Sequence, residues 1–302
     1  MLSASQEIRD GDESPDRIRS PNHIVLATDF SARCDRAQNR AVQLAVQWNA
    51  SLTAVHVLSD IDVTDDVSLR DAYRAAARRN ANRLREELAC VEGLRSSVIV
   101  QEGPIDAVLV EAAARERAEL LVTGIAGSGQ LGQALIGSTV TALARASSVP
   151  LLVVKKKVLN KYAKAAVATD LSDSSKPALA AALHWFAFRE LVLFHAVDQP
   201  YRGMVDDKTA YDIQSETSSL NQCHSFVKDV AGDCAIENLD IIVRRGDPVT
   251  GLRILANDAD IDLVVSGTHG RTELLHVLFG SVASRILNEV PCDVLVVPSR
   301  SR

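Results

Sequence analysis

The feature that most constrains this chain is a spaced glycine motif, G-x2-G-x9-G-S, which occurs twice, 143 residues apart. Each copy follows a short apolar run, residues 119–123 in the first half and 262–266 in the second. The repeated spacing indicates a tandem duplication. Because glycine lacks a Cβ, the backbone at such positions can approach a phosphate group closely. The two copies comprise Gly124, Gly127, Gly137 and Ser138, and Gly267, Gly270, Gly280 and Ser281.

The length of 302 residues suits two domains of about 150 residues each. We expect a flexible tail over residues 1–20, where glycine, proline, serine and mixed charges dominate, a first domain over 21–156 and a second over 157–302. The formal net charge of −6 argues against general nucleic-acid binding, because a nucleic-acid surface usually carries a basic excess. The expected partner is therefore a small molecule or another protein.

The sequence predicts a cytoplasmic protein without a membrane segment. No run approaches 18 consecutive apolar residues, and residues 3–22 lack the apolar core of a signal peptide. The five cysteines are scattered without a C-x-x-C pair, which favours reduced thiols used for packing over disulfides or a zinc site.

Both halves alternate predicted strands with predicted helices, which is typical of right-handed βαβ units. The expected fold class is therefore α/β, with two tandem open-sheet, Rossmann-like domains, each a five-stranded parallel sheet flanked by helices. Residues 155–161 form a short charged linker that allows the domains to pack closely. The expected strands are 23–29, 52–57, 97–101, 119–123 and 149–154, then 163–170, 190–195, 240–244, 262–266 and 290–297; the expected helices include 36–50, 68–91, 176–188 and 209–230.

The repeated polar residues and glycines fall at the carboxyl ends of predicted strands, where open parallel sheets bind ligands. Asp29 and Asp170 end the first strand of each half. The segments at Gly137 and Gly280 open helices, whose free N–H groups and dipole can hold phosphate oxygens. The ligand that this arrangement predicts is a nucleotide.

Several of these features also have simpler or rival interpretations. Residues 127–132 match G-x-G-x-x-G, but the second half lacks this pattern and the match follows the fourth strand, which argues against a dinucleotide site. Neither a P-loop nor a G-x-S-x-G elbow is present in the sequence. Asp29 and Asp170 could instead cap helices, His56 and His195 suggest a structural hydrogen bond, and the glycines could serve tight turns alone. The basic runs at 155–157 and 244–245 are expected to be solvated.

With the paired motif and the strand-one aspartates, the chain resembles a tandem universal stress protein of the adenine-nucleotide-binding type, over about residues 21–300. The resemblance implies ATP binding, with Mg²⁺ carried by the phosphates and no protein metal ligands or catalytic residues. The second half is closer to the family pattern, because Ala126 and Ser128 stand where His269 and Arg271 do. The implied ATP-binding residues are Ala27, Asp29, Val57, Thr123, Gly124, Gly127, Gly137, Ser138, Thr139 and Val140, and Ala168, Asp170, Ala196, Ser266, Gly267, Gly270, Arg271, Gly280, Ser281, Val282 and Ala283.

The function expected from this resemblance is a nucleotide-dependent stress-response regulator, a sensor more than a catalyst. The alternatives are a slow Mg²⁺-dependent ATPase, although the motif offers no general base or arginine finger, and a nucleotide-free module that binds a protein partner. The apolar closing strands at 149–154 and 290–297 need covering. In similar proteins that strand pairs across a two-fold axis, so the two domains are expected to form an intramolecular pseudo-dimer, and association of two chains into a homodimer is left open.

Overall fold

A computed structural model of the chain describes residues 19–59, 67–125, 136–198, 204–232, 239–268 and 279–299. The tail predicted over residues 1–20 lies almost entirely outside this part of the chain.

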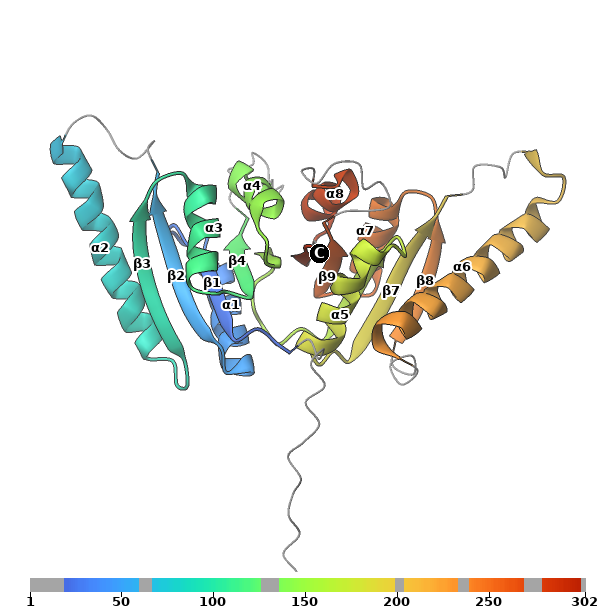
Figure 1. Cartoon of the computed structure of the whole chain (residues 1–302), viewed down its shortest axis with the longest axis horizontal. Helices are drawn as coiled ribbons and strands as arrows, with labels where there is room; N and C mark the ends of the chain where they lie inside the picture. Colours follow the sequence, from blue (N-terminus) through green and yellow to red (C-terminus); the bar gives the residue numbers. More distant parts are fainter. Residues whose placement is uncertain are drawn as a thin grey trace, which may run out of the picture.

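Each half repeats one order of strands and helices (Figure 1). The first half contains β1 His23–Ala27, α1 Asp35–Trp48, β2 Ser51–Leu58, α2 Val67–Ala89, β3 Arg95–Glu102, α3 Ile105–Arg115, β4 Leu120–Gly124, α4 Ser138–Ala146 and β5 Leu151–Val154. The second half contains β6 Lys164–Thr169, a 3-10 turn Asp173–Ser175, α5 Lys176–Trp185, β7 Glu190–Val197, α6 Lys208–Ala231, β8 Leu239–Arg245, α7 Pro248–Asp258, β9 Leu263–Gly267, α8 Ser281–Glu289 and β10 Asp293–Val297.

The strands form one ten-stranded sheet in the order β3-β2-β1-β4-β5-β10-β9-β6-β7-β8. Neighbouring strands are parallel within each half, and the two halves meet where β5 pairs antiparallel with β10. The strand order of one half therefore mirrors that of the other about the β5–β10 pair. The predicted α/β class with two parallel five-stranded units is confirmed, as is the predicted pairing of the closing strands. Because of this pairing, β5 and β10 are central strands, and β3 and β8 form the edges.

The central strands are near-continuous apolar runs because helices cover both faces of the sheet. Every residue of β4, β9 and β10 is buried, as this arrangement requires. The helices contribute stripes of small and branched apolar side chains, such as Ala37, Ala41 and Leu44 in α1, spaced three and four residues apart.

Two layers of core sandwich the sheet. Side chains of α1, α2, α5 and α6 form the cluster on one face, and those of α3, α4, α7 and α8 form the cluster on the other. Each cluster contains residues from both halves, so the cores are continuous across the β5–β10 junction. On the first face, Trp48 of α1 packs edge-on against Trp185 and Phe186 at the end of α5, and its indole N–H donates to the Trp185 carbonyl at 2.9 Å.

The connection between the halves is more buried than its charge suggests. Lys155 is only 8% exposed, and its Nζ donates to the carbonyls of Leu287 and Val290 at 2.6 Å each, at the end of α8. The expectation that residues 155–157 form a solvated run is therefore wrong for Lys155. The physical reason is that these unpaired helix carbonyls need donors, and a long side chain from the linker reaches them.

Most element boundaries differ from the sequence-based expectation by one or two residues, and the largest shifts, of three residues, occur at the end of α5 and the start of β10. α5 ends at Trp185 instead of residue 188, because Phe186 is extended and joins the aromatic cluster. The closing strands begin at Leu151 and Asp293, two and three residues later than expected, at the positions where each strand starts to pair.

Candidate functional site

A cavity of about 380 Å³ opens at the carboxyl ends of β6, β7 and β9 in the second half. These strands bracket the point where the strand order of this half reverses, between β6 and β9. Its volume lies within the range of roughly 300–1,000 Å³ that is common for small-molecule sites. Nine of the predicted site residues line it: Ala168, Asp170, Ala196, Ser266, Gly267, Gly280, Ser281, Val282 and Ala283.

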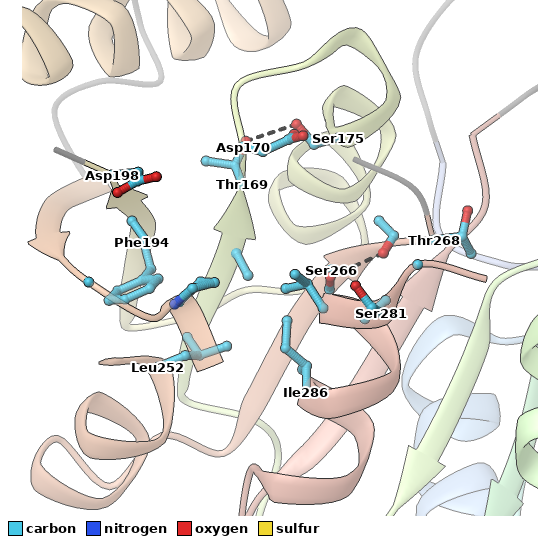
Figure 2. A pocket seen from close by; sticks show the side chains of 18 residues that line it. Thr169, Asp170, Ser175, Phe194, Asp198, Leu252, Ser266, Thr268, Ser281 and Ile286 are labelled. Atoms are coloured by element: carbon cyan, nitrogen blue, oxygen red, sulfur yellow. Dashed lines mark hydrogen bonds between the residues drawn. The ribbon is translucent and has the colours of Figure 1, made fainter. Parts of the chain in front are cut away.

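The cavity has an apolar floor and polar walls (Figure 2). The side chains of Phe194, Leu252 and Ile286 come from β7, α7 and α8 and form the floor. Asp198 lies beside Phe194 at one end, whereas Thr268 and Ser281 lie at the other. An apolar base between an acidic end and a hydroxyl-rich end suits a flat ligand that carries polar groups at both extremities.

The loop after β6 holds Asp170 in a fixed turn. Oδ1 of Asp170 accepts hydrogen bonds from the Ser172 backbone N–H at 3.1 Å and from the Ser172 hydroxyl at 2.6 Å. Thr169 supports the same turn, because its hydroxyl bonds that of Ser175 at 2.8 Å and accepts from the Leu171 N–H at 2.9 Å. Asp170 thus closes a local turn at the strand end and does not cap α5, whose N-cap is Ser175.

Asp29 occupies the same turn in the first half. Its Oδ1 accepts from the Ser31 N–H at 2.8 Å, and the N-cap of α1 is Cys34. Burial works to raise the pKa of Asp29, but hydrogen bonds from Ser31 and Cys34 outweigh it and hold the pKa below its usual value. Burial raises the pKa of the Cys34 thiol to about 11, so this cysteine is a protonated neighbour of Asp29.

The two repeated histidines are structural, as the sequence suggested. Nδ1 of His56 bonds the carbonyl of Thr28 at 2.9 Å, and Nδ1 of His195 bonds the carbonyl of Thr169 at the same distance. Each ring therefore ties the end of the second strand to the loop that carries the aspartate.

The first turn of α8 presents its backbone to the cavity. The Gly280 N–H is occupied, because it donates to the Thr268 carbonyl at 2.9 Å, and the Ser284 N–H bonds the Gly280 carbonyl as the first helical bond. The N–H groups of Ser281, Val282 and Ala283 are the first-turn donors that a helix leaves for an external acceptor. Together with the helix dipole they form an anion-binding end.

The glycines that begin α4 and α8 have ordinary backbone angles. Gly137 has φ −68° and ψ 159°, and Gly280 has φ −60° and ψ 142°, a region open to any residue. A tight turn therefore does not require glycine at these positions. Gly246, which lines the cavity, differs because its φ is 97°, a value that residues with a side chain rarely adopt. Gly103, at the corresponding position of the first half, also has a positive φ, of 136°.

The structure places the remaining first-half residues at corresponding positions. Ala27 ends β1, Val57 lies in β2, and Thr123 and Gly124 end β4. Gly137 is the N-cap of α4, and Ser138, Thr139 and Val140 form the first turn of that helix. Three predicted site residues, Gly127, Gly270 and Arg271, lie outside the described residues.

Sequence reasoning missed several residues of the cavity wall. Among them are Phe194 and Leu252 of the floor, Asp198 and Thr268. Phe194 looked like an ordinary strand residue, and only its position directly before the repeated His195 signalled that it lies near the site. Gly246 and Pro248, on either side of the N-cap residue Asp247 of α7, also line the cavity.

The part of the chain that the structure describes contains no group of three or more His, Cys, Asp or Glu side chains that could hold a metal ion. None of its helices is long and apolar enough to cross a membrane. Cys34, Cys90, Cys223 and Cys292 are free thiols.

Comparison with known proteins identifies relatives that agree with this duplicated architecture. The model of the universal stress protein family matches twice, over residues 21–155 and 161–298. The chain is 26% identical over 307 residues to a universal stress protein of Mycolicibacterium smegmatis, covering 92% of this chain and 97% of that protein.

Solved structures show the same fold over nearly the whole length. A functionally unknown protein from Pseudomonas aeruginosa PAO1 superposes with a TM-score of 0.67 at 20% identity, covering 92% of this chain and 93% of the other. A universal stress protein from Archaeoglobus fulgidus superposes with a TM-score of 0.64 at 18% identity, covering 93% and 97%. With both halves matched by the family model, the chain belongs to the universal stress protein family and carries two of its domains in tandem.

Proposed function

We propose that this protein binds ATP in the cavity of its second half and works as a nucleotide-dependent regulator of the stress response. The observation that carries the proposal is the convergence, in one cavity, of the strand-end acid Asp170, an apolar floor and the free first turn of α8. Family membership supports the regulatory role.

Each part of the cavity matches one part of an adenine nucleotide. The hydroxyls of a ribose donate hydrogen bonds, and the Asp170 carboxylate after β6 accepts them. The adenine ring lies on the apolar floor beside Ala196, with Phe194 beneath it. The phosphates bind the N–H groups of Ser281, Val282 and Ala283 and the Ser281 hydroxyl, where the helix dipole favours negative charge.

Mg²⁺ is proposed to bind to the phosphates of the nucleotide. Mg²⁺ keeps several of its waters and commonly binds through substrate phosphates, so the site needs no protein cage for it. Gly270 and Arg271 are proposed as further phosphate contacts from the loop after β9, Arg271 as a charged donor worth about 1.5–3 kcal/mol if it forms a hydrogen bond. In the first half, Asp29, Gly124, Gly127 and the first turn of α4 form the corresponding weaker site.

The enzyme alternative is slow hydrolysis of the bound ATP. A phosphoryl-transfer site needs a group that positions the attacking water and cations that neutralise the developing charge. Phosphate release by the wild type and by Gly280→Val tests this alternative. Equal release by both proteins assigns the activity to a contaminant, whereas release lost in the variant assigns it to this site.

The third alternative is a nucleotide-free protein-interaction module. Hydrogen exchange separates it from ATP binding, because a bound triphosphate protects the amides that it engages. We expect ATP with Mg²⁺ to slow exchange at residues 281–283 relative to residues 138–140, and AMP to protect them less. Unchanged exchange at 281–283 under saturating ATP would favour the module. The cytoplasm, which supplies ATP and keeps thiols reduced, is the proposed compartment.

A further inference from the structure

The antiparallel β5–β10 pair relates the halves by a pseudo-two-fold axis, so the molecule has two equivalent corners where one half meets the other. The first corner lies at the end of β5 and the start of β10. The second lies at the start of β5 and the end of β10. The duplication allows the two corners to be compared residue by residue.

The first corner is filled by a buried charged cluster. Asp293, fully buried, accepts hydrogen bonds from the backbone N–H groups of Lys155 and Lys156 at 2.7 and 2.8 Å and from the Tyr162 hydroxyl at 2.6 Å. Nε of Arg40 lies 3.6 Å from Oδ2 of Asp293, and the guanidinium carbon of Arg40 stands 3.8 Å above the centre of the Tyr162 ring. This cluster joins α1 of the first half to β10 of the second.

The second corner is a cavity of about 440 Å³. Ala181 and Arg40 both lie eleven residues after their strand-one aspartates, so alanine replaces the arginine there. Pro150 and Pro298 occupy the positions that correspond to Asp293 and Lys155, each at the same distance from its loop glycine. All three replacements line the cavity, which therefore exists because the side chains that fill its counterpart are missing.

Most residues that line this cavity are apolar, and the two charged ones are exposed at its mouth and carry opposite signs. Trp185 replaces Leu44 in the wall, and its buried indole N–H finds no acceptor among the described residues. Arg19 and Glu119 also line the cavity. Oε2 of Glu119 accepts from the backbone N–H and the side-chain amide of Asn22, and a carboxylate with two oxygens keeps further capacity to accept hydrogen bonds.

From this lining we infer that the second corner binds a free α-amino acid with an apolar side chain. The arginine at the mouth pairs with the ligand's carboxylate, and the glutamate pairs with its ammonium group. The apolar side chain enters the space that an arginine occupies in the other corner and packs on Trp185 and the prolines. A residue within a peptide lacks the two adjacent charges, which selects the free amino acid. The site is separate from the nucleotide cavity and does not depend on the function proposed for it.

The indole N–H signals of a ¹⁵N-labelled protein provide a direct test, because the chain has two tryptophans. Trp48→Phe leaves one indole signal and so assigns that of Trp185. We expect L-phenylalanine to shift the Trp185 signal saturably, and N-acetyl-L-phenylalanine amide, which lacks both charges, to leave it unmoved.

Variants tie the effect to the cavity. Ala181→Arg, which restores the residue of the filled corner, should abolish the shift, and Ala181→Leu should do the same if the arginine variant fails to fold. Arg19→Ala and Glu119→Gln should each weaken binding at least tenfold, whereas Lys157→Ala, which removes an exposed cation from the linker, should not. A Trp185 signal unmoved by L-phenylalanine, L-leucine and L-isoleucine overturns the inference. So does a response that Ala181→Leu leaves intact, or equal shifts with the uncharged amide.

Discussion

The floor of the cavity in the second half differs from the same place in the first half at two positions that compensate each other. Phe194 precedes the repeated histidine where the first half has Val55, and Gly251 in α7 stands where α3 has Val108. A Cβ on Gly251 would lie 2.8 Å from Cζ of Phe194, so the ring occupies the space that a side chain would take. The second half thus has one large and one small residue where the first half has two valines. The total side-chain volume is similar, and cores tolerate such exchanges well.

The two interdomain corners differ more, because no such compensation occurs there. One corner holds a buried carboxylate, an arginine, a lysine and a tyrosine. The other corner lacks these side chains and contains a cavity in their place. In this chain the differences compensate each other inside the half but not at the junction between the halves.

The largest effect is expected at the filled corner. Asp293→Ala removes the acceptor that faces Arg40, Tyr162 and the linker amides, and leaves buried donors without a partner. Breaking such a cluster should lower the free energy of unfolding by about 3–5 kcal/mol, measured by urea denaturation. Glu190→Ala, which removes an exposed ion pair with Lys164, serves as the control and should cost less than about 1 kcal/mol. Equal losses in both variants would contradict the stabilising role of the cluster.

The next effect distinguishes the two proposed nucleotide sites. Gly280→Val places a branched side chain at the start of α8, where the phosphates are proposed to bind, and should weaken ATP binding about 100-fold, equivalent to about 2.7 kcal/mol. Gly137→Val makes the same change at the start of α4, with a similar backbone conformation, and should change the affinity little. Calorimetric titration of both variants measures the difference. A larger loss of ATP affinity in Gly137→Val would indicate that the main site lies in the first half.

A smaller effect is expected at the compensating pair. Gly251→Ala forces the Phe194 ring to shift, which should lower the free energy of unfolding by about 1–3 kcal/mol and weaken ligand binding at the cavity floor. Phe194→Val combined with Gly251→Val rebuilds the pair of the first half and should recover stability without restoring the original cavity. Thermal unfolding in the presence and absence of ATP reads both effects. No destabilisation by Gly251→Ala would show that the ring moves freely.

The smallest effect is a pH dependence at the linker. Burial lowers the pKa of Lys155 from 10.5 to about 8. Between these values the unfolded chain binds a proton that the folded chain does not, so stability from this group rises with pH across the window. Below pH 8 the lysine is charged in both states and the cost of burying the charge is present in full.

The comparison of wild type with Lys155→Met isolates this contribution, because other titrating groups occur in both proteins. The stability of the wild type relative to the variant should increase from pH 8 to pH 10, as followed by urea denaturation. A difference that stays constant or falls over this range would contradict a depressed pKa.

The sequence was sufficient to predict the order of strands and helices and the duplication, because these follow from periodicity and motif spacing. The pairing of the closing strands was predicted from the resemblance to universal stress proteins. The sequence also located Asp170 and the first turn of α8 at one site. It did not identify Phe194 or Asp198 as cavity residues, since their roles depend on which helix packs over β7. Lys155 was assigned to a solvated run because its local sequence is charged, and its partners lie more than 130 residues away. The sequence did not predict side-chain contacts between residues that lie far apart along the chain.

Calorimetric titration of nucleotide-free protein with ATP and Mg²⁺ tests the ATP site proposed in the second half, formed by Asp170, the apolar floor and α8. We expect at least one tight site per chain, with a stoichiometry near one if only the second half binds strongly and near two if both halves do. The tight site should disappear in Gly280→Val. No heat of binding, together with an unchanged melting temperature in saturating ATP, would contradict the account.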